Sequence, residues 1–382
     1  MFTYIFIYFI IIFLMMFRRF YIYYLNKNCN YGEDSGLIDW AKYYKKPFYF
    51  CLKFVLNDKF NTDTYWNTVK DKLLLIINKK KYNIKYDFDK NKLTEAKIND
   101  INEICFSKNI NIKNFCKMKE LHNNNPIIVN KLNNEYTFLF DHLVYDGLNA
   151  YNDILSYLFD FKKMGVRKNV YIPFIYENII IFRFIEILYN NFIFKRTLIS
   201  SNKSKQSVIY HNYDINVIKR YKNEYNLKFI DVALAFYCKK VFDSLLKKKK
   251  RLNVGLIYAL EDYRFRNNYC FFDLYIYNKS IKDMAYDINR QIEYKKKFIY
   301  IQHNLMSCYY NINNFYKSNF DIYFSPMMMI NKPNDIINIK VLMTDIYQPL
   351  YCYMGTTNNY MSFSTTVNCD NINIEEFGKE IK

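Results

Sequence analysis

The sequence predicts an α/β chain, of the α+β sandwich type, with two similar lobes behind an N-terminal transmembrane helix. Three observations predict this organisation. Apolar residues make up 51% of the 382 residues, enough to fill one large core or two of medium size. Strand-like and helix-like patterns alternate twice along the chain. An uncharged stretch precedes all of them and ends at two arginines.

Residues 2–17 form the uncharged stretch, and Arg18 and Arg19 follow it directly. The stretch is slightly shorter than the ~20 residues of a membrane-spanning helix, but the aromatic residues 20–25 extend it at the interface. A cleaved signal peptide would usually begin with positive residues and end in small ones. Because Arg18, Arg19 and Lys27 follow the stretch, we expect residues 1–27 to anchor the chain and the remainder to lie on the cytoplasmic side. A buried N-terminal strand or helix is the alternative.

A polar linker, residues 28–40, leads into the N-terminal lobe, residues 41–165. Apolar alternation predicts the strands of this lobe, and apolar spacing of three and four residues predicts its helices. The expected strands are Phe48–Leu56, Ile127–Leu132 and Tyr136–Phe140, and the expected helices are Thr62–Asn78 and Leu148–Phe161.

Residues 166–205 connect the lobes. Within them, residues 174–194 are apolar, but Arg183, Glu186 and Asn190 fall on one helical face. This spacing favours an amphipathic helix, one that could lie on the bilayer surface, over a second transmembrane span.

The C-terminal lobe, residues 206–382, repeats the pattern of the first. Its expected strands are Ser207–Asn212, Leu252–Ala259, Tyr269–Tyr277, Asp321–Phe324, Ile337–Met343 and Tyr360–Val367; its expected helices are Asn216–Tyr225, Phe229–Leu246, Ile281–Lys296, Tyr300–Tyr316 and a short one from Ile374.

The net charge of +19 would suit a nucleic acid or an anionic membrane. The basic runs 79–81, 247–251 and 295–297 lie at the ends of apolar segments, where solvated helix termini are the ordinary explanation, and no nucleic-acid-binding motif accompanies them. We therefore expect no nucleic-acid partner.

The nine cysteines occur singly and there are four histidines, so we expect neither a metal site nor a disulfide framework. Free cysteines favour a reducing compartment.

A polar cluster follows the apolar strand 136–140 and reads Asp141-His142-Leu143-Val144-Tyr145-Asp146-Gly147. A neutral imidazole can take a proton from an alcohol, amine or thiol near neutral pH, so His142 is the candidate general base. Asp146 can hold the turn by pairing with an arginine from elsewhere, and Gly147 allows a backbone conformation that a Cβ would forbid. The structural alternative is that Asp146 caps the following helix and that His142 is a hydrogen-bonded histidine at a strand end.

The segment His142–Gly147 resembles the HxxxDG motif of the chloramphenicol-acetyltransferase-like superfamily. That superfamily includes dihydrolipoyl acyltransferases, peptide-synthetase condensation domains, BAHD acyltransferases and bacterial wax ester synthase/diacylglycerol acyltransferases. Asp141 matches the DH of the dihydrolipoyl enzymes and departs from the HH of condensation domains and wax ester synthases. The position of the motif inside the first half of the chain resembles the two-lobed branch. No DFGWG segment, the signature of BAHD enzymes, is present.

Looser matches extend the resemblance over residues 40–382. Asn125–Val129 resembles the segment before the motif strand, Leu227–Ala235 the helix that opens the second lobe, and Tyr360–Ile381 the closing strand and helix. Val254–Phe272 resembles the strand and arginine segment of the second lobe. Arg264 and Asn268 are the nearest equivalents of its structural pair.

The resemblance implies two lobes that form a pseudo-dimer around a central tunnel, with His142 at its middle. Acyl-CoA, the expected co-substrate, would enter from one face and a hydrophobic alcohol from the other, and no tightly bound cofactor is implied. The acceptor, deprotonated by His142, would attack the thioester without an acyl-enzyme, and the resulting oxyanion would need a hydrogen-bond donor. The candidate donors are hydroxyls: Ser325, Ser362, Ser364 and Thr365.

Two other functions stay open at this point. One is an amide-forming condensation enzyme that uses carrier-protein thioesters, and the other is a catalytically inactive, membrane-bound scaffold of the same fold. Cys116 or Cys308 would need a base at its side to act as a nucleophile, and the sequence places none there. His122, His211 and His303 are assigned no role, because no partner stands at metal or triad spacing.

Overall fold

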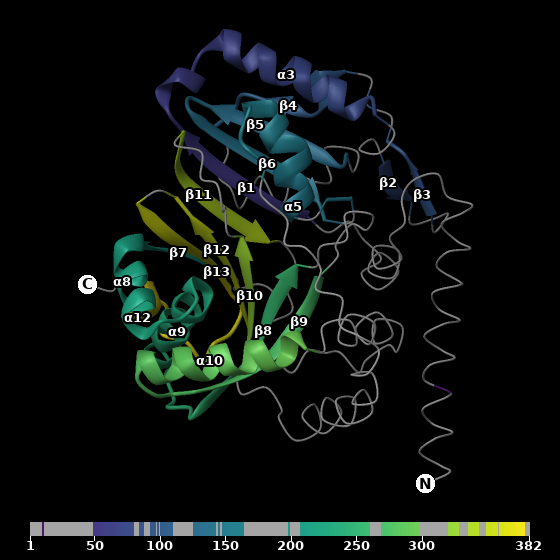
Figure 1. The fold of residues 1–382 in the computed structure, drawn as a ribbon. Coiled ribbons are helices and arrows are strands. Elements are labelled where there is room, and N and C mark those ends of the chain that lie inside the picture. The colour runs from purple at the N-terminus through teal and green to yellow at the C-terminus, as the bar shows by residue number, and fades with distance from the viewer. Residues whose placement is uncertain are drawn as a thin grey trace.

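The fold comes from a computed structural model (Figure 1). It describes residues 10, 49–79, 84–87, 92–96, 98, 100–109, 125–142, 144–145, 147–163, 198, 207–259, 269–297, 320–327, 335–343, 349–357 and 359–378. Two sheets dominate it, and helices cover each of them.

The first sheet has five strands in the order β11-β1-β6-β5-β4. They are β1 (Tyr49–Leu56), β4 (Cys105–Phe106), β5 (Ile127–Leu132), β6 (Glu135–Asp141) and β11 (Ile336–Met343). Neighbouring strands are antiparallel except β4 with β5. Alternate residues of β1 and β6 enter one core with α3 (Asp63–Ile77) and α6 (Ser156–Phe159). Period-two burial therefore fixes which side of this sheet meets the helices.

Local sequence explains how two parts of this lobe begin. α3 starts after Thr62, whose hydroxyl accepts the Tyr65 N–H at 3.1 Å, as an N-cap does. The hairpin of β5 and β6 turns at Asn133, whose φ of 53° lies in the left-handed region that asparagine tolerates. The lobe also holds the short elements η1 (Asp58–Phe60), β2 (Ile84–Asp87), β3 (Lys92–Glu95), η2 (Ile101–Glu103), α5 (Gly147–Asn149) and the π-helical η4 (Ala150–Leu155).

The second sheet has six strands in the order β7-β13-β12-β10-β8-β9. They are β7 (Ser207–Asp214), β8 (Arg251–Ala259), β9 (Tyr269–Tyr277), β10 (Ile322–Met327), β12 (Leu350–Thr356) and β13 (Tyr360–Val367). Four helices pack with this sheet: α8 (Ile215–Tyr225), α9 (Phe229–Asp243), α10 (Ile281–Lys296) and α12 (Ile374–Gly378). The buried Asp321 carboxylate precedes β10 and accepts the N–H groups of Leu198 at 2.6 Å and Asn253 at 2.8 Å.

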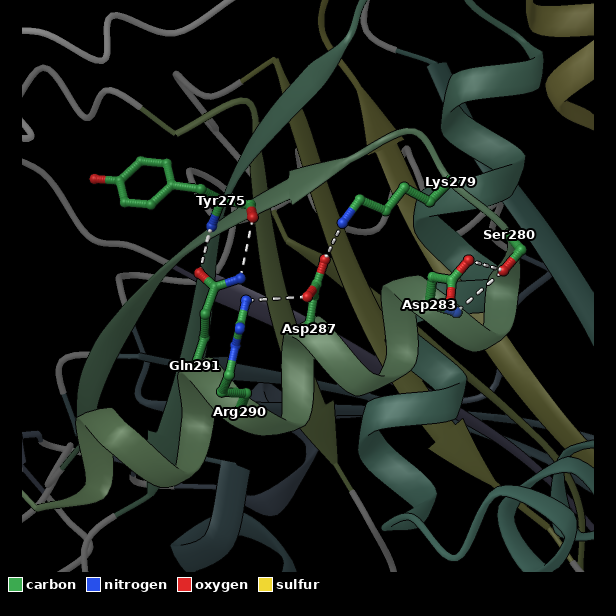
Figure 2. A network of polar contacts seen from close by, with 7 residues as sticks. All are labelled: Tyr275, Lys279, Ser280, Asp283, Asp287, Arg290 and Gln291. Atoms are coloured by element: carbon green, nitrogen blue, oxygen red, sulfur yellow. Dashed lines mark hydrogen bonds and ion pairs between the residues drawn. The ribbon is translucent and has the colours of Figure 1, made fainter.

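Helix α10 is fastened to the edge strand β9 by a polar network (Figure 2). The Gln291 amide accepts the Tyr275 N–H at 2.9 Å and donates to the Tyr275 carbonyl at 3.0 Å, so it satisfies backbone groups that an edge strand leaves open. Ser280 caps the helix, and its side chain accepts the Asp283 N–H. Asp287 pairs with Lys279 and Arg290. The helix therefore covers β9 through specific bonds as well as apolar contact.

The two sheets meet at β11. This strand comes from the predicted C-terminal lobe, yet it pairs antiparallel with β1 and completes the first sheet. Its Val341 N–H donates to Ser364 Oγ of β13 at 3.1 Å. The Lys340 ammonium lies 4.7 Å from the centroid of the Tyr210 ring of β7. Gly355 of β12 faces Ile339 so closely that a Cβ at position 355 would lie 2.9 Å from Ile339 Cγ2.

The structure differs from the predicted elements at several points. Strand β12 was not predicted, because all seven of its residues are buried and the run lacks an alternation of apolar and polar residues. The helix expected over Leu148–Phe161 contains a π-helical stretch. α9 ends at Asp243, three residues before the predicted end. The predicted helix 300–316 and the connector helix 174–194 lie outside the described residues.

Among the residues that the structure describes, no helix combines the length and the hydrophobicity needed to cross a bilayer. The anchor predicted over residues 2–25 lies outside the described residues except for Ile10. A transmembrane segment there stays a prediction.

Candidate functional site

His142 lies at the point where β6 ends, directly after Asp141. The Asp141 carbonyl accepts hydrogen bonds from the N–H groups of Val144 and Tyr145, both at 2.9 Å. These two hydrogen bonds hold a turn of the chain immediately after the strand. His142 as a whole residue is half-buried. Its ring stands edge-on to the Phe50 ring, with centroids 5.2 Å apart.

Phe50 places this histidine beside the strand that joins the sheets. Phe50 is buried, stacks on Phe140 with centroids 5.2 Å apart, and pairs in register with Phe140 on one side and Met343 of β11 on the other. The His142 ring therefore contacts β1 between β6 and β11. Strand β11 also contacts β13 through Val341, so β1 is one strand away from the contact between the sheets.

A buried acidic group adjoins the histidine. Asp141 is 2% exposed and stands opposite Tyr49 in the register of β1 and β6. Burial, and after it the charge of Asp141, raises the pKa of the Tyr49 hydroxyl far above its usual range. Tyr49 therefore stays protonated at neutral pH.

The other residues of the motif are only partly placed. Asp146 lies outside the described residues, so its expected pairing with an arginine stays a prediction. Gly147 is half-buried and begins α5. The structural pair Arg264 and Asn268 also lies outside the described residues.

The pleat of the second sheet separates the four candidate oxyanion donors. Ser325 stands opposite Tyr353, and Tyr353 opposite Ser364, so the two serines share a face. Ser362, two residues before Ser364 on β13, shares it as well. Thr365 points to the other face, where its hydroxyl lies 3.2 Å from the Tyr237 hydroxyl of α9. Thr365 is 0% exposed beneath a helix, and this position does not support a role at His142.

The hydrogen bonds of the three serines distinguish them further. Ser362 donates to Asn212 Oδ1 at 2.7 Å, so its proton is engaged. Ser364 accepts from Val341, and a hydroxyl that accepts a bond keeps its own proton for donation. Ser325 is half-buried on β10. Ser364 and Ser325 therefore suit an oxyanion donor better than Ser362, and Ser364 also touches β11.

Tyrosines that sequence reasoning did not single out stand on the same face as these serines. Tyr323 and Tyr351 stack with ring centroids 5.8 Å apart and an interplanar angle of 5°. The ring centroids of Tyr351 and Tyr353 are 4.9 Å apart. Burial raises the pKa of Tyr351 well above its usual range. The spacing of Tyr351 and Tyr353 two residues apart was a signal of a shared strand face that could have found them.

Five cysteines whose side chains the structure describes do not resemble nucleophiles. Cys51, Cys105, Cys238, Cys352 and Cys369 are all buried. Burial raises the pKa of the Cys369 thiol to about 11 and that of Cys105 to about 12, so neither supplies thiolate at neutral pH. Cys116 and Cys308 lie outside the described residues.

His211 is a core histidine. It is 2% exposed, and its Nε2 lies within hydrogen-bond distance of the Phe377 carbonyl of α12. His122 and His303 lie outside the described residues. Within the described ranges, no group of three metal-ligating side chains occurs.

Comparison with solved structures identifies the class of fold. The chain superposes on a wax ester synthase/diacylglycerol acyltransferase from Marinobacter aquaeolei VT8 with a TM-score of 0.52 and 11% identity, over 86% of this chain and 92% of that one. It superposes on the trichothecene 15-O-acetyltransferase of Fusarium sporotrichioides with a TM-score of 0.59 and 10% identity, over 87% and 89%. The starter condensation domain of rhizomide synthetase, solved with C8-CoA and Leu-SNAC, gives 0.58 and 8%, over 91% of each chain.

This chain has the two-lobed chloramphenicol-acetyltransferase-like fold that its HxxxDG segment predicts. No protein-family model matches the sequence, and a search of curated proteins finds no relative. At 8–11% identity the likeness establishes the fold and leaves the activity to be argued from the site.

Proposed function

We propose that this chain is an acyltransferase that moves an acyl group from a CoA thioester to the hydroxyl of a hydrophobic alcohol. The observation that carries the proposal is the position of His142, a half-buried histidine at a strand end whose ring contacts Phe50, beside the strand that joins the two sheets. The fold supports acyl transfer in general, because the solved neighbours include acyltransferases and condensation domains.

In the proposed reaction, His142 takes the proton of the acceptor hydroxyl as its oxygen attacks the thioester carbonyl carbon. The carbonyl oxygen becomes an oxyanion, to which Ser364 or Ser325 would donate a hydrogen bond. The carbon–sulfur bond then breaks, and the departing thiolate recovers the proton from the imidazolium. The products are an ester and a free thiol, with no acyl-enzyme.

Within this proposal, residues 2–25 hold the enzyme in a membrane with the two lobes on the cytoplasmic side, where an acceptor dissolved in the bilayer would be at hand. Asp146 and Gly147 are assigned the turn behind His142. Arg264 and Asn268 are assigned a structural pairing in the second lobe.

Replacing the base tests the proposal. Purified full-length protein should release free thiol from acyl-CoA when a long-chain alcohol is present, and His142→Ala should lower this rate by ~10²-fold or more, since general-base catalysis contributes at least that factor. His122→Ala, a histidine without an assigned role, serves as the matched control. An unchanged rate in His142→Ala would exclude His142 as the base.

Condensation with a carrier-protein thioester is the second candidate, favoured by the likeness to condensation domains. Parallel assays with acyl-CoA and acyl-carrier donors, and with alcohol and amine acceptors, separate the two activities. If no donor turns over while acyl-CoA still binds, the inactive scaffold is the better description.

A further inference from the structure

A surface patch on the N-terminal lobe combines exposed apolar side chains with lysines. We define it as the exposed residues of segments 70–79 and 156–163, which are the C-terminal half of α3 with the two residues after it, and α6 with the four residues after it. Leu74, Leu75 and Tyr157 are 38%, 57% and 40% exposed. The helix already buries five apolar side chains in the core, so Leu74 and Leu75 are not needed to hold it there.

Two lysines bracket the exposed ring. The Lys72 and Lys79 ammonium groups lie 5.8 Å and 5.7 Å from the centroid of Tyr157. Lys72 and Leu75 are three residues apart and share one face of α3, and Lys79 follows two residues after the helix ends. An apolar side chain and an aromatic ring thus lie between cationic groups on long, flexible stems.

The charge of the patch is positive. Its exposed charged residues are Lys79, Lys162 and Lys163 against Asp71 and Asp160, which gives three minus two, or a net +1, and the half-buried Lys70 and Lys72 of the same segments add two further cations beside it. Lys72 is paired with Asp160 at 2.8 Å, whereas Lys79, Lys162 and Lys163 are exposed. The sequence continues the basic run with Lys80 and Lys81.

We propose that this patch docks the folded body on an anionic phospholipid surface. A membrane interface accepts leucine and tyrosine at the boundary of the acyl chains, while lysine ammonium groups reach the phosphates. Charge complementarity selects anionic lipid over a neutral one. The inference goes beyond a terminal anchor, because it fixes which side of the globular body faces the bilayer, and it does not depend on the acyltransferase activity.

Lysine acetylation of the full-length protein, read by mass spectrometry, tests the proposal residue by residue. The probes are vesicles of pure phosphatidylcholine and vesicles with about 30% phosphatidylglycerol, which supply the anionic surface. Lys79 and Lys163 should be labelled about fivefold less on the anionic vesicles. Lys282 on α10 is the matched control, because it is exposed and lies 5.5 Å from the Tyr225 ring centroid, at the other end of the molecule (Figure 1).

Paired variants identify the cause of the protection. L74S/L75S should abolish the loss of labelling at Lys79, whereas Leu246→Ser, on a leucine that is 62% exposed in the other lobe, should leave it intact. Equal labelling of Lys79 and Lys282 on anionic vesicles would overturn the proposal, as would equal protection on neutral vesicles. Protection that grows with protein concentration in the absence of lipid would instead assign the patch to a second copy of the chain.

Discussion

Phe50 is an aromatic neighbour of the candidate base, and its edge-to-face contact restricts how the imidazole can turn. Restricting a base to one productive orientation matters because misplacement of about 1 Å can cost large factors in rate. Phe50 is therefore assigned a positioning role within the proposed reaction, separate from the chemistry of His142.

Replacing Phe50 by leucine removes the aromatic edge and keeps most of the apolar volume. We expect kcat to fall about threefold to tenfold with KM little changed, and stability to fall by about 1 kcal/mol. Phe54→Leu is the control, since Phe54 lies on the same face of β1 and contacts Phe138 instead of the histidine. An equal fall of kcat in both variants would reduce Phe50 to a packing role.

A second single residue controls stability. Asp231 is 0% exposed in α9 and accepts the Lys228 N–H at 3.2 Å and the Asn289 amide at 2.7 Å. Burial raises the pKa of its carboxyl in spite of these bonds, so the folded state holds the proton more tightly than the unfolded chain. This contribution is fully present below the unfolded pKa, and it is lost as pH rises through the folded pKa.

Asp231→Asn keeps an acceptor oxygen and removes the buried charge. We expect it to raise the free energy of unfolding at pH 7 by about 1 kcal/mol and to flatten the decline of stability between acid and neutral pH. Urea titrations at several pH values measure both effects. Asp243→Asn in the same helix breaks an exposed pair with Lys239 and should change little. A variant less stable at pH 7 than the wild type would refute the assignment.

At the scale of elements, the contact of β11 with β12 and β13 holds the two sheets together. Gly355→Ala would press a methyl group against Ile339, and we expect a loss of about 1–3 kcal/mol of stability. Gly378→Ala is the matched control, because nothing lies within 4 Å of the Cβ it would gain. In a double-mutant cycle, Ile339→Ala should relieve part of the cost, so additive effects would contradict a direct contact.

At the scale of the whole molecule, the sequence predicted the class of fold and most strands, because alternation and turn residues are local signals. The Phe48–Leu56 and Tyr360–Val367 predictions correspond closely to β1 and β13. The pairing of β11 with β1 could not be predicted from local signals, because the alternation in Ile336–Met343 does not specify which sheet the strand joins.

The candidate site shows the same division. His142 was predicted from its motif. Phe50 lies far from His142 in the sequence, and the two residues come into contact because β1 pairs with β6. Strand periodicity predicts that Ser364 and Thr365 lie on opposite faces of their sheet. It does not predict which of the two faces contacts the first sheet. Both features depend on pairing between strands that are far apart in the sequence, and local sequence patterns do not specify such pairing.

The bond pair between Gln291 and Tyr275 also bears on assembly. An incoming strand from another copy would find this rung of the outermost ladder already filled by a side-chain amide. A strand of an identical molecule therefore cannot form these two backbone hydrogen bonds at Tyr275. The Gln291 side chain thus opposes edge-to-edge extension of the six-stranded sheet, the kind of strand addition that leads to aggregation.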